Sequence, residues 1–178
     1  MIPALALILL AAPAELPQAA PDAAGASHAL RGALTVFVFM SVECPISNRS
    51  IPNLNELAQK YAGKVRFFGV NPEADVTAAQ VAQHDKDFAL GFVTLLDPKQ
   101  SLAKALGAET TPTAVLVDAN GAVLYRGRID DQVVDFGKSR PKAKREDLRE
   151  ALDEALAGKA VSVPRTPSVG CAIVGAHR

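Results

Sequence analysis

The sequence predicts an α/β protein with a mixed central β-sheet flanked by helices. Two buried strands separated by an amphipathic helix come first, at residues 34–40 and 64–70, and a hairpin followed by another amphipathic helix comes last. Strands joined through a helix pair in parallel with a right-handed crossover, whereas a two-residue turn joins antiparallel strands. The order of these elements therefore favours one sheet with both kinds of pairing.

The first predicted strand, residues 34–40, reads LTVFVFM, an apolar run without alternation. Such a run is typical of a strand that is buried on both faces. A helix follows, with Pro45 suited to its first turn and Gly63 just beyond its end. Its apolar residues recur at helical spacing: Ile51, Leu54, Leu57, Ala58 and Tyr61.

The middle of the chain contains a helical stretch at 77–90, a short apolar run at 92–97 and a small helix at 101–108. We interpret these elements as an insertion between the two halves of the fold. The pair Asn120–Gly121 then lies between two apolar runs, which is the strongest short-range signal for a β-hairpin.

The last predicted element is a well-capped amphipathic helix. Glu146 and Asp147 stand in its first turn, and Gly158 follows its last apolar residue. The apolar stripe consists of Leu148, Ala151, Leu152, Ala155 and Leu156.

Length and composition indicate a single domain with its own core and no nucleic-acid partner. The 178 residues include 19 Lys plus Arg, 19 Asp plus Glu and 49% hydrophobic residues. A chain of this length can bury a core without disulfides or metals, and its balanced charge gives no sign of a nucleic-acid surface. Small molecules or other proteins are the expected partners.

The opening residues 1–14, MIPALALILLAAPA, predict a signal peptide with a small-residue cleavage site, although no Lys or Arg precedes the apolar run. The run is shorter than the roughly 20 residues that span a bilayer, so no stable membrane span is expected. Residues 15–30 are interpreted as a linker or irregular lead-in. The expected location is periplasmic or extracellular, where disulfides persist.

Cys44 is the candidate nucleophile, because it lies where the first strand meets the first helix. A thiol at a helix N-terminus faces unpaired backbone N–H groups and the positive end of the helix dipole, which favours the thiolate. The alternative is a buried, inert cysteine. Glu43 stands directly before Cys44, and its carboxylate would oppose thiolate formation if it pointed toward the sulfur.

The order of elements resembles the thioredoxin fold, in particular the redoxin branch that includes the peroxiredoxins (AhpC/TSA-like proteins). Cys44 opens the first helix, Pro52 stands eight residues later, and Thr111-Pro112-Thr113 resembles the T-P-T of that fold, over residues 31–160. The CPIS site, GRIDDQ and the terminal GC-x-I also resemble a set of exported redoxin-domain proteins.

This resemblance implies a cis Thr111–Pro112 bond. Backbone groups of Thr111 would then lie beside Cys44, able to pair with an extended substrate segment as a short strand would.

Ser47 stands where a C-x-x-C motif has its second cysteine, so it cannot resolve a mixed disulfide or a sulfenic acid. Its hydroxyl can still donate a hydrogen bond to the thiolate and lower the pKa of Cys44. The other cysteine is Cys171, in a C-terminal arm at 161–178 that Pro164, Pro167 and Gly170 predict to be extended and mobile.

Three interpretations of the two cysteines stay open. Cys44 and Cys171 form a redox pair, or they form a permanent disulfide worth about 4–5 kcal/mol in the loop-entropy account. In the third interpretation both sulfurs bind Cu(I) together with His177 or His28, as copper-chaperone relatives of the fold do with cysteines and a histidine. No other cofactor is expected.

Two reactions fit the redox pair, thiol-disulfide exchange with a protein and reduction of a small peroxide, each with an external thiol reductant. Peroxiredoxins carry P-x-x-x-[TS]-x-x-C, in which the hydroxyl and a remote Arg orient the peroxide. Ser41 fits the hydroxyl position, whereas Phe37 replaces the proline. The candidate guanidinium groups belong to Arg128, Arg126 and Arg49.

The expected function is therefore that of an exported thiol-dependent oxidoreductase. Cys44 and Cys171 are its catalytic residues, and Ser41, Ser47, Thr111, Pro112 and Arg128 support them. The alternative is a non-enzymatic binding module. His84 is expected to be a solvated surface residue.

Overall fold

A computed structural model describes residues 15–175. The predicted signal peptide at 1–14 lies outside the described residues, and so does His177. Among the described residues, no helix combines the length and the apolar character needed to cross a membrane.

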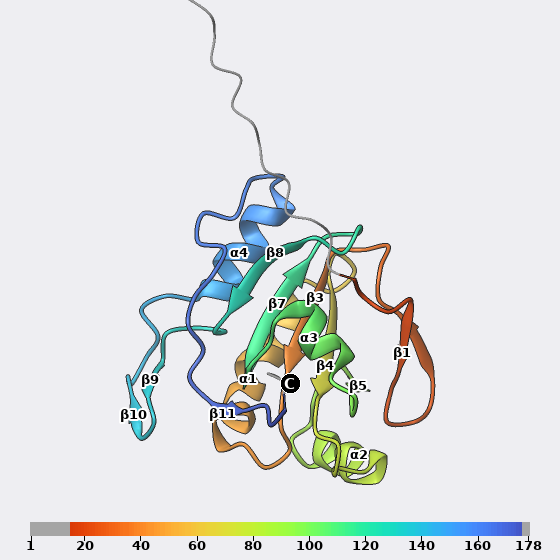
Figure 1. Cartoon of the computed structure of the whole chain (residues 1–178). Helices are drawn as coiled ribbons and strands as arrows, with labels where there is room; N and C mark the ends of the chain where they lie inside the picture. Colours follow the sequence, from red (N-terminus) through yellow and green to blue (C-terminus); the bar gives the residue numbers. More distant parts are fainter. Residues whose placement is uncertain (1–14, 176–178) are drawn as a thin grey trace, which may run out of the picture.

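The centre of the molecule is a mixed five-stranded sheet in the order β5-β4-β3-β7-β8 (Figure 1). β3 pairs in parallel with β4 and antiparallel with β7, and β4 pairs in parallel with β5. The fold is therefore thioredoxin-like, as the order of elements predicts. The strands are β3 (Thr35–Phe39), β4 (Arg66–Asn71), β5 (Val93–Leu96), β7 (Thr113–Val117) and β8 (Val123–Gly127).

Helices cover both faces of the sheet and complete a three-layer arrangement (Figure 1). α1 and α4 pack on one face and α3 on the other, while α2 lies beside β5 at the edge. The helices are α1 (Pro45–Lys60), α2 (Ala78–Asp87), α3 (Ser101–Leu106) and α4 (Asp147–Leu156).

The unbroken apolar run of β3 is explained by these two layers. Val36 and Val38 point into the core beneath α1 and α4, whereas Phe37 and Phe39 point into the core beneath α3. Successive side chains of a strand face opposite sides of its sheet, so a strand covered on both sides needs apolar residues at every position. All five residues of β3 are buried.

The middle of the chain differs from the predicted insertion. β5 belongs to the central sheet, in parallel register with β4, and α2 makes the crossover between them. The segment is therefore a second βαβ unit. Its strand has only four residues and one exposed end, so its apolar run was too short to distinguish an edge strand from an insertion.

Residues 15–30, interpreted from the sequence as a linker or irregular lead-in, contain a small hairpin. β1 (Ala19–Pro21) pairs antiparallel with β2 (Ser27–Ala29), and the Asp22 carboxylate accepts hydrogen bonds from backbone N–H groups of the turn. Leu16 and Leu30 pack into the core beneath α3. Contacts with distant residues therefore order a segment whose own pattern shows no period.

Four further short strands lie around the sheet: β6 (Thr110–Thr111), β9 (Val133–Asp135), β10 (Lys138–Ser139) and β11 (Cys171–Ala172). β9 pairs with β10 in a hairpin that precedes α4. β6 pairs with β11 and carries the chain into the loop at Pro112. This last pair joins the C-terminal arm to the body of the protein.

Replacing Leu148 by Ala should destabilise the fold far more than the same change at Leu156. Both residues lie in α4, but Leu148 is 0% exposed and Leu156 is 40% exposed. Removing a fully buried leucine side chain costs about 2–5 kcal/mol, because a cavity adds to the lost burial. Urea unfolding of both variants measures the difference, and equal losses would contradict the placement of α4.

Candidate active site

Cys44 lies where the C-terminal end of β3 meets the start of α1 (Figure 1). It is the N-cap of α1, Pro45 follows in the first turn, and the thiol is almost completely buried, at 1% exposure. The backbone N–H of Asn48 bonds to the Cys44 carbonyl, which starts the helical hydrogen-bond pattern. The sulfur therefore sits at the positive end of the α1 dipole, as the sequence predicts.

The Thr111–Pro112 peptide bond is cis, as the resemblance implied. The Thr111 carbonyl lies beside Cys44 and accepts a hydrogen bond from its thiol at 3.3 Å. Thr111 itself is buried and belongs to β6. The backbone next to Cys44 is thus a strand edge.

The C-terminal arm occupies this strand edge. β11 pairs antiparallel with β6 in a register that sets Cys171 opposite Thr111 and Ala172 opposite Thr110. Both cysteines are free thiols, and their Sγ atoms lie 2.7 Å apart, with Cys171 donating to Cys44. Cys44 and Cys171, 127 positions apart in the chain, are thus brought into contact.

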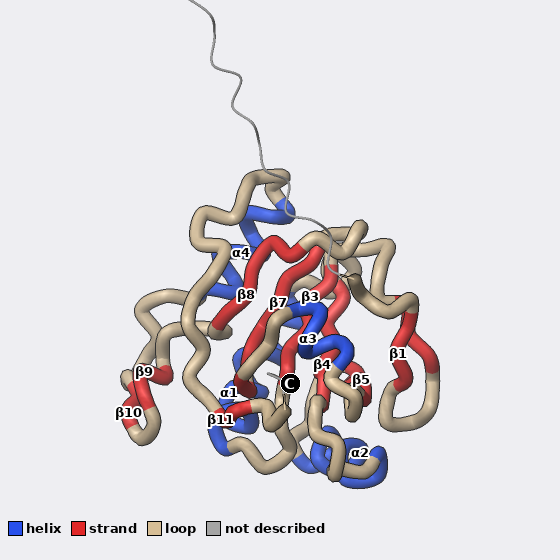
Figure 2. Tube along the Cα trace, viewed as in Figure 1, coloured by secondary structure: helices blue, strands red, loops and turns tan. Residues whose placement is uncertain are grey.

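The described part of the arm makes backbone contacts with β8 and β6 (Figure 2). Its Thr166 N–H bonds to the Arg126 carbonyl, and the Thr166 hydroxyl bonds to the buried Tyr125 hydroxyl at 2.7 Å. Nearer the end, Ile173 is 6% exposed within the core beneath α3. The prolines make the arm extended, but its contacts with β8 and β6 hold it in place.

Glycine permits the closest approach of the arm to the site. A Cβ atom at Gly170 would overlap the carbonyl oxygen of Thr111 and would also crowd the ring of Pro112. Thus only a residue without a side chain fits immediately before Cys171 in this register.

Hydrogen bonds shift the pKa values of the two thiols in opposite directions. Burial raises the pKa of Cys44, but the hydrogen bond from Cys171 and those from the Ser47 backbone and hydroxyl outweigh it and lower that pKa to about 7. The hydrogen bond to Cys44, burial and the negative charges of Cys44 and Glu73 raise the pKa of Cys171 to about 11. Cys44 is thus the sulfur that ionises near neutral pH, whereas Cys171 stays a thiol.

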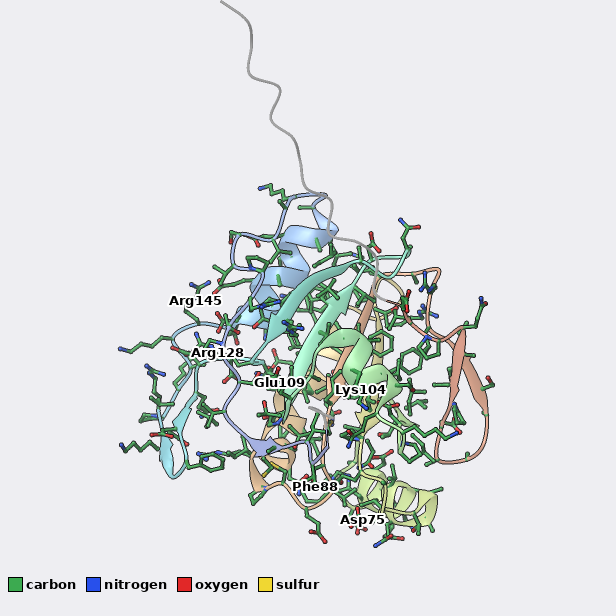
Figure 3. All side chains as sticks on the ribbon, in the orientation of Figure 1. Asp75, Phe88, Lys104, Glu109, Arg128 and Arg145 are labelled. Atoms are coloured by element: carbon green, nitrogen blue, oxygen red, sulfur yellow. The ribbon has the colours of Figure 1, made fainter. Side chains whose placement is uncertain are left out.

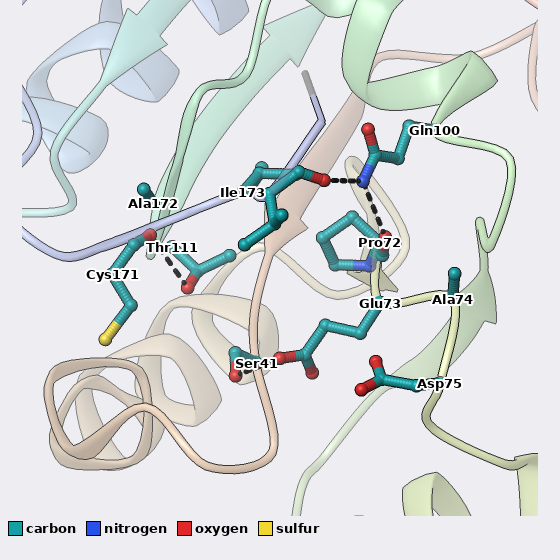
Figure 4. Close-up of a pocket in the computed structure, with 11 residues that line it drawn as sticks. Ser41, Pro72, Glu73, Ala74, Asp75, Gln100, Thr111, Cys171, Ala172 and Ile173 are labelled. Carbon is teal, nitrogen blue, oxygen red and sulfur yellow. Dashed lines mark hydrogen bonds between the residues drawn. The ribbon is translucent and has the colours of Figure 1, made fainter. Parts of the chain in front are cut away.

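A cavity of about 400 Å³ opens beside the thiol pair, between the arm and the loop after β4 (Figure 4). Glu73 projects from that loop, and its carboxylate accepts hydrogen bonds from the Ser41 hydroxyl at 2.8 Å and from Asn71. The sequence analysis missed Glu73. Its place just after the strand that pairs with β3 was the available signal, because neighbouring parallel strands end at the same edge of a sheet.

Of the other residues expected at the site, the two serines lie beside Cys44, whereas Arg126 and Arg128 bind groups elsewhere in the fold. Ser41 and Ser47 lie at the site and are themselves in contact, through the Ser41 N–H and the Ser47 hydroxyl at 3.5 Å. Arg128, which is labelled in Figure 3, instead bonds to the buried carboxylate of Asp147 on α4, at 2.7 Å. Arg126 donates to the Leu106 carbonyl at the end of α3.

Arg49 and Glu43 are both exposed. The sequence could place Arg126 and Arg128 near one strand, but it could not reveal that distant groups on α3 and α4 engage them.

The two histidines that the structure describes, His28 and His84, make structural contacts. His28 bonds to Asp22 within the β1–β2 hairpin at 2.8 Å. His84, expected on the surface, has a side chain only 9% exposed and bonds to Asn48 of α1 at 2.8 Å, so that expectation was wrong. Across residues 15–175, no cluster of three or more His, Cys, Asp or Glu side chains suits a metal ion.

Removing the Ser47 hydroxyl should raise the pKa of Cys44 from about 7, because this hydroxyl stabilises the thiolate. Ultraviolet thiolate absorbance of reduced Ser47→Ala, followed against pH, measures the shift. Since a lowered pKa makes the thiolate the form present above about pH 7, the variant should lose thiolate near neutrality. Ser50→Ala, one turn further along α1, is the control, because that hydroxyl bonds to the Ile46 carbonyl. An unchanged midpoint in Ser47→Ala would contradict the assignment.

Two solved structures match nearly the whole chain. A hypothetical protein from Sinorhizobium meliloti 1021 is 30% identical, with a TM-score of 0.76, covering 93% of this chain and 94% of its own. An uncharacterized conserved protein from Geobacillus kaustophilus is 28% identical, with a TM-score of 0.77, covering 92% and 90%. A candidate thiol:disulfide interchange protein DsbE from Chlorobium tepidum is 26% identical, with a TM-score of 0.53, covering 61% and 77%.

No curated protein matches the chain at the significance required. The model of the Redoxin family matches residues 11–140, which include β3, α1 with Cys44 at its start, the Thr111–Pro112 loop and the β7–β8 hairpin. The chain therefore belongs to the Redoxin family.

Proposed function

We propose that this protein is a thiol-disulfide oxidoreductase in which Cys44 is the nucleophile and Cys171 the resolving cysteine. The observation that carries the proposal is the pairing of β11 with β6, which presents Cys171 Sγ at 2.7 Å from Cys44 Sγ. Membership of the Redoxin family and the likeness to a candidate interchange protein support the reaction class.

The difference in pKa between the two thiols defines their roles in this proposal. A nucleophile with a pKa of about 7 is ionised to a substantial extent at neutral pH and keeps good nucleophilicity, because reactivity is best when the pKa is near the ambient pH. A thiol with a pKa of about 11 stays protonated and donates to the thiolate. Cys44 therefore attacks first, and Cys171 follows.

Two exchange steps complete the reaction. The Cys44 thiolate attacks a substrate disulfide, forming a mixed disulfide and releasing one substrate sulfur as a thiolate that takes up a proton. Cys171 then loses its proton and attacks Cys44 Sγ, forming the Cys44–Cys171 disulfide and releasing the second substrate thiol. The substrate gains two electrons, which an external thiol reductant later restores to the protein.

Ser47 assists without taking part in electron transfer. At the position of the second cysteine in C-x-x-C, its backbone N–H and hydroxyl both lower the pKa of Cys44. The resolving sulfur comes instead from the arm. The motif is thus divided between two parts of the chain, with stabilisation of the thiolate on α1 and resolution on β11.

Reduction of a peroxide has less support from the contacts of the site. That reaction would use the Ser41 hydroxyl and a guanidinium to orient the peroxide. The Ser41 hydroxyl donates to the Glu73 carboxylate, and Arg128 is bound to Asp147. A carboxylate at the mouth of the site also opposes the approach of a peroxide anion or the formation of more negative charge.

Export forms part of the proposal. The opening residues 1–14 have the composition and length of a signal peptide, and an oxidising compartment would supply disulfide substrates.

Glutathione redox titration of the full chain, with mass-resolved alkylation of both cysteines, tests the redox pair. We expect a Cys44–Cys171 disulfide that cycles at about −270 to −180 mV, the range of thioredoxins and disulfide isomerases. A disulfide that resists reduction below about −300 mV would indicate a structural bond instead. Failure of the two cysteines to pair would overturn the resolving role of Cys171.

Replacing Cys171 by Ser should trap Cys44 in a mixed disulfide with the substrate, because the second exchange step loses its nucleophile. Non-reducing gels and mass spectrometry detect the trapped species after addition of a disulfide substrate. Loss of stability without any trapped species would favour the structural interpretation of the cysteine pair.

A further inference from the structure

The edge of β6 beside Cys44 is a binding site for one extended strand, and the arm of this chain already fills it. Cys171 and Ala172 pair with Thr111 and Thr110, and Ile173 donates its N–H to the Glu109 carbonyl at 2.8 Å. The arm therefore shows how an extended peptide presents a cysteine sulfur to Cys44.

We propose that this edge binds a segment of a partner protein with the pattern Gly-Cys-x-aliphatic. In the resting protein, arm residues 170–173 cover the edge, and they leave it before the partner segment pairs there. The inference rests on the proposed thiol-disulfide exchange. It adds the substrate class and a step in which the arm and the partner exchange places.

Burial of Cys44 requires the displacement. With the arm docked, the nucleophile is 1% exposed and in contact with Cys171 and Thr111. An external disulfide must approach Cys44 Sγ within bonding distance. It cannot do so while Cys171 occupies that position, so the arm leaves before the partner binds.

The glycine preference follows from the space beside Thr111. The residue before the cysteine passes so close to the Thr111 carbonyl that any Cβ would overlap it, as the contacts of Gly170 show. A partner segment in the same register meets the same oxygen. Glycine is therefore the residue that fits immediately before the attacked cysteine.

The aliphatic preference follows from the place of Ile173. This side chain is 6% exposed and belongs to the core beneath α3, whereas the next residue, Val174, is 87% exposed. When the arm leaves, the position of Ile173 becomes an apolar depression next to the cavity in Figure 4. An aliphatic side chain two residues after the partner cysteine fills it.

The exchange of strands also couples resolution to product release. After Cys44 attacks, the partner sulfur is bonded to Cys44, and the partner's other sulfur has left as a thiolate and taken up a proton. The arm then returns to β6, Cys171 loses its proton and attacks Cys44 Sγ, and the partner leaves as a dithiol. One strand site thus serves both steps, so docking of the arm favours departure of the partner.

Peptides test the pattern on the unaltered protein. The probe is VGCAIV, a copy of residues 169–174, carried as a disulfide with thionitrobenzoate. Release of the chromophore by the reduced protein measures the first attack, and mass spectrometry of samples quenched before Cys171 resolves the mixed disulfide shows that the peptide is attached to Cys44. Replacing the glycine or the isoleucine of the peptide by alanine should slow attachment about tenfold or more, in keeping with a clash or a lost buried side chain.

Replacement of the last valine of the peptide by alanine is the matched control, because Val174 is exposed in the arm. It should leave the rate unchanged. Equal rates for all four peptides would overturn the proposed pattern. If the Cys44–Cys171 disulfide still cycles in glutathione, the proposed function stands while this inference fails; if it never forms, the proposed function fails first.

Arm variants test the exchange. Gly170→Ala keeps both cysteines but disfavours docking, so VGCAIV should attach to Cys44 faster by about tenfold while the Cys44–Cys171 disulfide forms more slowly. Ile173→Ala weakens docking without a clash and should show the same two changes to a smaller extent. Val174→Ala should match the parent protein. Thermal melts confirm that each variant is folded, and unchanged rates in folded Gly170→Ala and Ile173→Ala would overturn the exchange.

Discussion

The backbone pairing of β11 with β6 is the interaction on which the site depends. It sets Cys171 opposite Thr111 and so brings its sulfur to 2.7 Å from that of Cys44. Without this pairing, Cys44 would still contact Ser47, the Thr111 carbonyl and the helix N-terminus, but no second thiol would lie beside it. In a C-x-x-C motif both thiols lie in one short segment, whereas here a tertiary contact brings the two sulfurs together.

The pairing also determines the electrostatics. Cys44 is buried, which by itself disfavours a thiolate, yet hydrogen bonds from Cys171 and Ser47 bring its pKa to about 7. The same contact raises the pKa of Cys171 to about 11. One hydrogen bond thus shifts the pKa values of the two thiols in opposite directions, and undocking of the arm would change both values together.

The layers of the fold hold these groups in position. β3 ends at Phe39, shortly before Cys44; its neighbour β4 leads into Glu73, and β7 begins directly after Pro112. These ends meet at one edge of a sheet that is buried on both faces. Packing on both sides of the sheet therefore holds the residues of the site in position. The arm is anchored to the same support by Thr166 at β8 and by Ile173 beneath α3.

The sequence alone determined the order of most elements, the place of Cys44 at the start of a helix and the T-P-T loop, because apolar periodicity and capping residues are local. It also identified Cys171 and Ser47 as the residues to weigh. Only the tertiary structure decided that the arm is docked, that β5 joins the sheet, that Glu73 binds Ser41 and that Arg128 binds Asp147. Each of those contacts joins residues far apart in the chain, and local pattern carries no information about which distant partner a side chain will meet.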